Sequence, residues 1–169
     1  MREWIPVPSS AQGRLALRAL EAFGRHGYAG VSVGELAAAA GVTTGSLYHH
    51  FGSKLGLYSV IRHEVEQRIL DRMEGAAAAR AGDRPAYAAL LVGFDYGVQH
   101  GFARLLAEPH PEKGEDPVAA LLERLTGGLL GRLLAAAWRY ALGAVAEGND
   151  VDHIRAALSQ MCCEPLADG

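Results

Sequence analysis

The sequence predicts an all-α protein. Half of its 169 residues are hydrophobic, alanine and leucine are abundant and few residues are β-branched, which favours helices over strands. Apolar residues recur at helical spacing in several segments, and no segment shows the alternation that is typical of a half-buried strand. A chain of this length can bury a core and fold as one or two small domains without disulfide bonds.

Capping residues predict two helices near the N-terminus. Ser9 and Gln12 form a candidate capping box for a first helix, whose apolar residues fall on one face, and Gly27 is expected to end it. Ser32 begins a second capping box, and Gly41 is expected to end that helix after about two turns.

A third and a fourth helix are expected after very short connections. Thr43 can cap a helix over the sequence TGSLYHHF, which Gly52 ends. Ser53 can cap the next helix, which we expect to run from Lys54 to about Arg80 because apolar residues recur along one side of it.

The remaining residues are also expected to be helical. A break at residues 82–85 ends with a proline that can restart a helix, and residues 108–117 are rich in proline and charge, as in a linker. The expected helices are, in order, one that begins after Pro85, a shorter one between Gly101 and Pro109, a long one from about Val118 to Glu147 and a short one from about Val151 to Cys163.

Charge is distributed unevenly along the chain, whose net charge is −3. Residues 1–62 carry six basic and three acidic residues, whereas the remainder carries ten basic and sixteen acidic residues. This asymmetry favours a polyanionic partner for the N-terminal part rather than for the whole chain.

The third expected helix is too polar for an ordinary core helix, since only Leu47 and Phe51 are suited to burial. Two short helices joined by a tight turn, with another helix before them, form a helix-turn-helix, whose second helix enters the major groove of DNA. Lys54 then places a positive charge beside the same DNA backbone. The hydrogen-bonding residues that could meet phosphates and base edges are Thr43, Thr44, Ser46, Tyr48, His49 and His50.

The segment AFGRHGYAGVSVGELAAAAGVTTGSLYHHFGSKLGLYSVI resembles the DNA-binding domain of the TetR (tetracycline-repressor-like) transcriptional regulators. It matches the family pattern, roughly F...G(Y/F)..(T/S)(V/T)..IA..AGVS.G.LY.HF.(S/N)K..L, from Phe23 through Leu57 without a gap. Gly34 departs from the pattern, because many relatives carry a polar or basic residue there. The resemblance implies phosphate contacts by Tyr48, His50 and Lys54, and base or phosphate contacts by Thr43, Thr44, Gly45, Ser46 and His49.

The resemblance also implies a function for each part of the chain. Residues 1–52 would be the helix-turn-helix DNA-binding domain, and residues 53–169 a helical effector-binding and dimerisation domain. The protein would then be a repressor that binds a palindromic operator in double-stranded DNA as a homodimer and is released by a small molecule. We expect no cofactor.

Apolar and aromatic residues of the C-terminal part are candidates for an effector pocket, so we expect a largely apolar or aromatic effector. These candidates are Tyr58, Ile61, Tyr87, Leu91, Phe94, Tyr96, His100, Phe102 and Trp138. Several of them could equally belong to an ordinary core.

Small residues at a spacing of four in the long helix would allow another helix to approach closely. We expect Gly127, Gly131 and Ala135, together with Leu142, to contribute to the dimer interface. Packing of the same small residues inside one chain is the alternative.

Other classes of function are less compatible with the sequence. There is no phosphate-binding loop and no G-x-S-x-G motif, and His49 and His50 lack a further Cys or His at ligand spacing, so we expect neither an enzyme nor a metal site. The main alternative is a helix-turn-helix protein without a small-molecule effector, which acts structurally or through a protein partner. An interior cavity would distinguish a ligand-responsive regulator from such a protein.

The expected location is the cytoplasm, without a membrane. The N-terminal residues lack the apolar core of a signal peptide, and the adjacent Cys162 and Cys163 are expected to be free thiols. Residues 117–147 are the most apolar stretch, but charged residues interrupt it.

Overall fold

The computed structural model describes residues 9–80, 82, 84–109 and 116–161, and these residues form helices and connections without a strand. The all-α prediction is therefore confirmed. The chain divides into two compact units, Met1–Val65 and Glu66–Gly169. The functional division between residues 52 and 53 stays a prediction.

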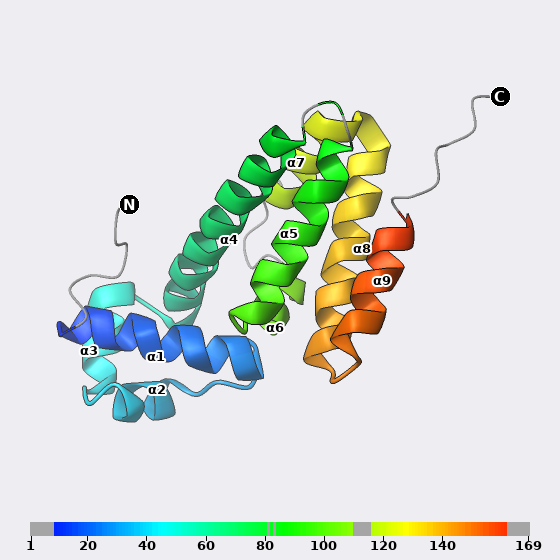
Figure 1. The fold of residues 1–169 in the computed structure, drawn as a ribbon. Helices are drawn as coiled ribbons and strands as arrows, with labels where there is room; N and C mark the ends of the chain where they lie inside the picture. The colour runs from blue at the N-terminus through cyan, green and yellow to red at the C-terminus, as the bar shows by residue number, and fades with distance from the viewer. Residues whose placement is uncertain (1–8, 81, 83, 110–115, 162–169) are drawn as a thin grey trace. The chain divides into compact units, whose positions relative to one another are not determined.

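The first unit contains α1 (Ala11–His26), α2 (Val33–Ala39), α3 (Thr44–Phe51) and the beginning of α4 (Lys54–Ala79). Each of the first three helices contacts the other two (Figure 1). Their shared core is apolar and almost inaccessible to solvent, so the three short helices stabilise one another through packing. The core residues include Leu15, Ala19, Phe23, Leu36, Leu47 and Leu57.

Side-chain caps begin these helices largely as predicted. The hydroxyl oxygens of Ser32, Thr43 and Ser53 each accept a hydrogen bond from the backbone N–H three residues later, at 3.1, 3.2 and 2.9 Å. The prediction for α1 was wrong by one residue, because Ser10 and not Ser9 is its cap. The Ser10 hydroxyl accepts from the Gly13 N–H at 3.0 Å, whereas Ser9 offers its carbonyl oxygen to the Arg14 guanidinium at 2.6 Å.

Hydrogen bonds fix the turn between α2 and α3, and one of them comes from a side chain of α1. Gly41 has a φ of +65°, a conformation that glycine adopts at little cost. The Val42 N–H donates to the Ala37 carbonyl oxygen at 3.0 Å, and the Arg14 Nε donates to the Ala40 carbonyl oxygen at 2.9 Å. The direction in which α3 leaves the turn is thus set by hydrogen bonds as well as by apolar packing.

The second unit is built around α8, which contacts α5, α6, α7 and α9. Figure 1 shows α8 running alongside α5 and α9. The Arg155 guanidinium binds both carboxylate oxygens of Asp95, at 2.7 and 2.8 Å, and this ion pair links α9 to α5. The helices after α4 are α5 (Pro85–Gln99), α6 (Ala103–Ala107), α7 (Pro117–Thr126), α8 (Gly128–Ala146) and α9 (Val151–Met161).

The expected long helix from Val118 to Glu147 is wrong, because α7 ends and α8 begins at Gly127 and Gly128. Both glycines have positive φ, +81° and +52°, so the backbone leaves the right-handed helical conformation between Thr126, the last residue of α7, and the first turn of α8. After this break, α7 packs closely on α8. A Cβ atom at Gly131 would lie 2.3 Å from the backbone nitrogen of Glu123, so only glycine allows that approach.

Among the described residues, α8 is the one helix that is long and apolar enough by length and composition to cross a membrane. Of its apolar window, 39% is buried inside the structure. The core helix of a helical domain meets the same criterion, so this composition is weak evidence for a membrane span. The expected free thiols Cys162 and Cys163, and residues 110–115 of the expected linker, lie outside the described residues.

Candidate nucleic-acid interface

The helix α3 presents almost its whole surface to solvent. Leu47 is its one fully buried residue, and the second predicted anchor, Phe51, is half-buried. Tyr48 is 53% exposed although it is aromatic. Ser46 is half-buried, and the other predicted contact residues of this segment, namely Thr43, Thr44, Gly45, His49 and His50, are exposed.

Both ends of α3 are fixed despite this exposure. At the beginning, Thr43 caps the helix through the Ser46 N–H, at 3.2 Å. At the end, Gly52 has a φ of +73° and donates its N–H to the Tyr48 carbonyl oxygen at 2.9 Å. The chain therefore presents a short, rigid helix with a polar outer face, a geometry suited to insertion into a groove.

The two histidines of α3 lie beside each other, with ring centroids 5.2 Å apart. Within the part of the chain that the structure describes, no group of three or more His, Cys, Asp or Glu residues could hold a metal ion. Both imidazoles are exposed and carry ring nitrogens that can donate or accept hydrogen bonds.

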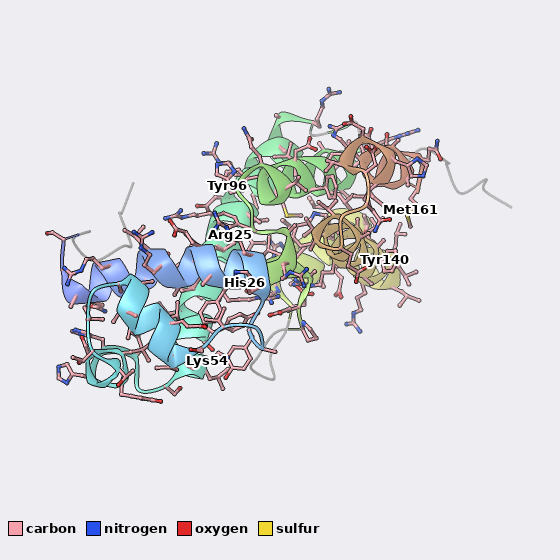
Figure 2. All side chains as sticks on the ribbon, turned by 90° about the horizontal axis from the view of Figure 1, so that it is seen from below. Arg25, His26, Lys54, Tyr96, Tyr140 and Met161 are labelled. Atoms are coloured by element: carbon pink, nitrogen blue, oxygen red, sulfur yellow. The ribbon has the colours of Figure 1, made fainter. Side chains whose placement is uncertain are left out.

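Lys54 begins α4 and is labelled in Figure 2. Its ammonium nitrogen lies 4.3 Å from the centroid of the Tyr28 ring, in the connection between α1 and α2. Sequence reasoning did not identify Tyr28 as part of this site, because 26 positions separate the two residues and no local pattern links them.

Comparison with known proteins agrees with this geometry. The family description "Bacterial regulatory proteins, tetR family" matches residues 17–61, which include α2, α3 and the beginning of α4. Residues 17–61 thus carry the DNA-binding domain of the tetR family. The resemblance inferred from the sequence is therefore confirmed.

The chain aligns with two curated relatives and spans about a third of the length of each. The HTH-type transcriptional regulatory protein RaaS of Mycobacterium tuberculosis is 40% identical over 82 residues, which are 48% of this chain and 37% of RaaS. The HTH-type transcriptional repressor AcnR of Corynebacterium glutamicum is 31% identical over 64 residues, which are 38% of this chain and 34% of AcnR.

Solved structures extend the likeness in fold to the rest of the chain. A tetR-family transcriptional regulator from Pectobacterium atrosepticum has a TM-score of 0.65 at 22% identity, with 87% of each chain covered. A gamma-butyrolactone receptor described as ArpA-like has a TM-score of 0.52 at 19% identity, with 90% of this chain and 75% of that chain covered. At these identities the likeness concerns the fold alone.

The structure distributes the candidate effector residues over several places. Tyr58 and Ile61 belong to the first unit and are buried there. Tyr87 and Leu91 line a groove of about 510 Å³ between α4, α5 and α9. At the end of α5, Tyr96 and His100 stack with ring centroids 4.0 Å apart, and Phe102 lies 5.8 Å from His100.

The two remaining candidates, Phe94 and Trp138, are fully buried in the second unit. The Trp138 indole nitrogen has no hydrogen-bond acceptor among the described residues. It lies beside Gly93, where an added Cβ atom would be 3.5 Å from that nitrogen. A buried N–H without an acceptor is energetically costly.

The residues expected at the dimer interface lie on the inner side of α8 or at its start. Gly131, Ala135 and Leu142 are buried within the chain, and Gly127 occupies the break before α8. The outer side instead carries large exposed apolar side chains that sequence reasoning missed. Leu129, Leu133 and Tyr140 are 70%, 59% and 80% exposed.

Proposed function

We propose that the chain is a transcriptional repressor that binds a palindromic operator as a homodimer and is released by a small, largely apolar or aromatic effector. The observation that carries this proposal is the geometry of α3, a capped, exposed, polar helix held by the buried Leu47 in a helix-turn-helix of the tetR family. The relative AcnR is a transcriptional repressor, which supports repression as the direction of control.

In the proposed complex, α3 lies in the major groove. Tyr48, His50 and Lys54 hold phosphates, which fix the position of the protein without reading sequence. Thr44 and Ser46 at the beginning of α3 face base edges, where hydroxyl groups can donate or accept hydrogen bonds. The remaining candidate contacts, Thr43, Gly45 and His49, lie on the same helix or its cap.

The proposed homodimer uses the outer face of α8. Leu129, Leu133 and Tyr140 are spaced by four and seven residues, so they lie on one side of the helix. Large exposed apolar side chains on one face are typical of a surface that another protein covers. A second copy of the chain, related by a two-fold axis, would bury this face and present two copies of α3 to the DNA.

The proposed effector site lies in the second unit, with the Trp138 indole nitrogen as a hydrogen-bond donor. The solved relative named a gamma-butyrolactone receptor supports a ligand-binding role for this fold. The helix α4 belongs to both units, because it begins at Lys54 and the division falls after Val65. A ligand that shifts α4 would thereby change the separation of the two reading helices.

Selection of genomic fragments by the purified protein tests the proposal. The expected result is one enriched inverted repeat, whose half-sites are separated by about one helical turn of DNA or a multiple of it. If the purified protein enriches no sequence in preference to bulk DNA, the proposed operator binding is wrong.

A further inference from the structure

The side chain of Lys54 rests against an aromatic ring from another part of the first unit. Its ammonium nitrogen is 4.3 Å from the centroid of the Tyr28 ring, well within the distance at which a cation is attracted to the face of an aromatic ring. Lys54 and Tyr28 are both half-buried, so solvent screens this attraction only in part.

The Tyr28 ring is itself held in place by the core. Tyr58, one turn after Lys54 on α4, contacts it edge to face with ring centroids 5.1 Å apart. Phe23 of α1 lies 6.4 Å from Tyr28 and 5.0 Å from Tyr58. Since Phe23 and Tyr58 are buried, Tyr28 forms the outer member of an aromatic cluster and offers Lys54 a fixed surface.

We propose that Tyr28 is a positioning residue, which holds the Lys54 ammonium at the start of α4, ready for a DNA phosphate. The inference rests on the proposed function, in which Lys54 contacts DNA. A lysine side chain has many rotamers, and ordering it on binding costs conformational entropy. A lysine that already rests on a ring loses less of that freedom when it meets its phosphate.

The contact with the ring leaves the ammonium able to bind DNA. A lysine ammonium has three N–H donors, and the ring occupies only one side of it. Because Lys54 is only half-buried, its remaining donors can meet a phosphate while the ring holds the side chain. Tyr28 contributes an attraction without a charge of its own, and its effect on DNA binding is transmitted through Lys54.

A double-mutant cycle with Tyr28→Leu and Lys54→Ala tests this role, with Tyr28→Phe as the conservative variant. Affinity is measured for operator and scrambled duplex across a salt series, and thermal unfolding shows that each variant is folded. We expect Tyr28→Leu to lower the affinity for both duplexes roughly two- to five-fold in the wild-type background. In the Lys54→Ala background, Tyr28→Leu should have no further effect on affinity. Tyr28→Phe keeps the ring and is expected to retain wild-type affinity.

An NMR measurement on the unmodified protein tests the same contact without relying on the folding of a variant. The chain has two lysines, Lys54 and Lys113, so lysine-selective labelling gives few resonances. We expect the ring current of Tyr28 to shift the Lys54 Hε resonances upfield of those of Lys113. Random-coil shifts for both lysines would overturn the proposed contact.

The outcomes separate this inference from the proposed function. If Lys54→Ala leaves DNA affinity unchanged, the phosphate contact itself is wrong, whatever the NMR shifts show. If Lys54→Ala weakens binding and Tyr28→Leu weakens it equally in both backgrounds, Lys54 contacts DNA but Tyr28 does not position it.

Discussion

Gly45, in the first turn of α3, is a glycine that the described structure does not require. A Cβ atom there would meet the Thr43 Oγ1 at 3.7 Å, which is ordinary van der Waals contact. Gly131 is the opposite case, because its Cβ atom would collide with the backbone of α7. A helical glycine costs up to about 1 kcal/mol of stability relative to alanine. We infer that the missing side chain at Gly45 leaves room for a DNA backbone.

Gly45→Ala is therefore expected to change the stability of the protein and its affinity for DNA in opposite directions. The free energy of unfolding should rise by about 0.5–1 kcal/mol, while affinity for operator falls because the methyl group occupies the space of the DNA. Urea unfolding and duplex titration measure the two effects. Gly75→Ala is the matched control, since Gly75 lies in α4 with open space around its Cβ position, and it should be stabilising without changing DNA affinity. Unchanged operator affinity in Gly45→Ala would exclude the close approach.

The short helices could be predicted from the sequence because each carries its own signals. Ser32, Thr43 and Ser53 accept the hydrogen bonds expected of caps, and Gly52 ends α3 with a positive φ. The break at Gly127 could not be predicted in this way. The adjacent Gly127 and Gly128 are a turn signal, but apolar residues continue on both sides of them, and the folding of α7 onto α8 depends on tertiary packing.

Asp116 fixes the beginning of α7. Its carboxylate accepts from the N–H groups of Val118 and Ala119, at 2.9 and 3.2 Å, and binds the Arg139 guanidinium through both oxygens at 2.7 Å. Arg139 also donates to the Leu106 carbonyl oxygen at 2.6 Å. Burial alone would raise the pKa of the Asp116 carboxyl, but the hydrogen bonds and charge of Arg139 and the two backbone amides hold this pKa below its ordinary value.

Asp116→Asn is expected to lower the free energy of unfolding by about 1–2 kcal/mol at pH 7, because asparagine keeps a capping oxygen but loses the charge that binds Arg139. Since the folded pKa lies below the unfolded value of about 3.9, this contribution is complete above that value and disappears as the pH falls through the lower folded pKa. Urea unfolding of both proteins from pH 7 to pH 3 measures the difference. The exposed Asp71→Asn is the control and should show little difference at any pH. A difference that stays constant or grows towards acid pH would contradict the assignment.

The proposal that the outer face of α8 forms the dimer interface can be tested by placing one charged side chain on that face. We expect Leu133→Glu to convert the dimer to a monomer at micromolar concentration, because pairing would bury an unpaired carboxylate. Light scattering gives the mass, and Leu55→Glu is a matched control on an exposed leucine of α4. Gly131→Leu would be a poor test, since its side chain would collide with α7 inside the same chain. A dimer that survives Leu133→Glu would place the interface elsewhere.

For the whole molecule, the sequence predicted the all-helical fold and the helix-turn-helix, but not how the second unit packs. The proposed DNA-contact residues are contiguous in sequence and unusually polar, so Thr43 through His50 could be singled out together, and their contacts with DNA stay a prediction. The candidate effector residues are ordinary apolar and aromatic residues. Periodicity cannot distinguish the core position of Phe94 from the groove position of Tyr87, because both lie on α5.

The ligand-responsive proposal makes a reciprocal prediction for the whole dimer. An apolar or aromatic ligand, found by thermal-shift screening, should bind free protein more tightly than operator-bound protein by about 5- to 150-fold, corresponding to about 1–3 kcal/mol. The same factor must describe how far the ligand weakens operator binding. Calorimetric titration with and without operator measures it. Equal ligand affinity in both titrations would favour the alternative, a DNA-binding protein without a small-molecule effector.

The most direct test of the account is a comparison of Ser46→Ala and Lys54→Ala on operator and scrambled duplex across a salt series. If α3 reads the groove, Ser46→Ala keeps non-specific binding but relaxes preference at one base step, by up to about 1–3 kcal/mol. Lys54→Ala then lowers the affinity for both duplexes about equally. It also reduces the slope of log affinity against log salt concentration by roughly one unit per half of the dimer. If Lys54→Ala changes sequence preference, or Ser46→Ala changes only the salt dependence, the proposed placement of α3 in the major groove is contradicted.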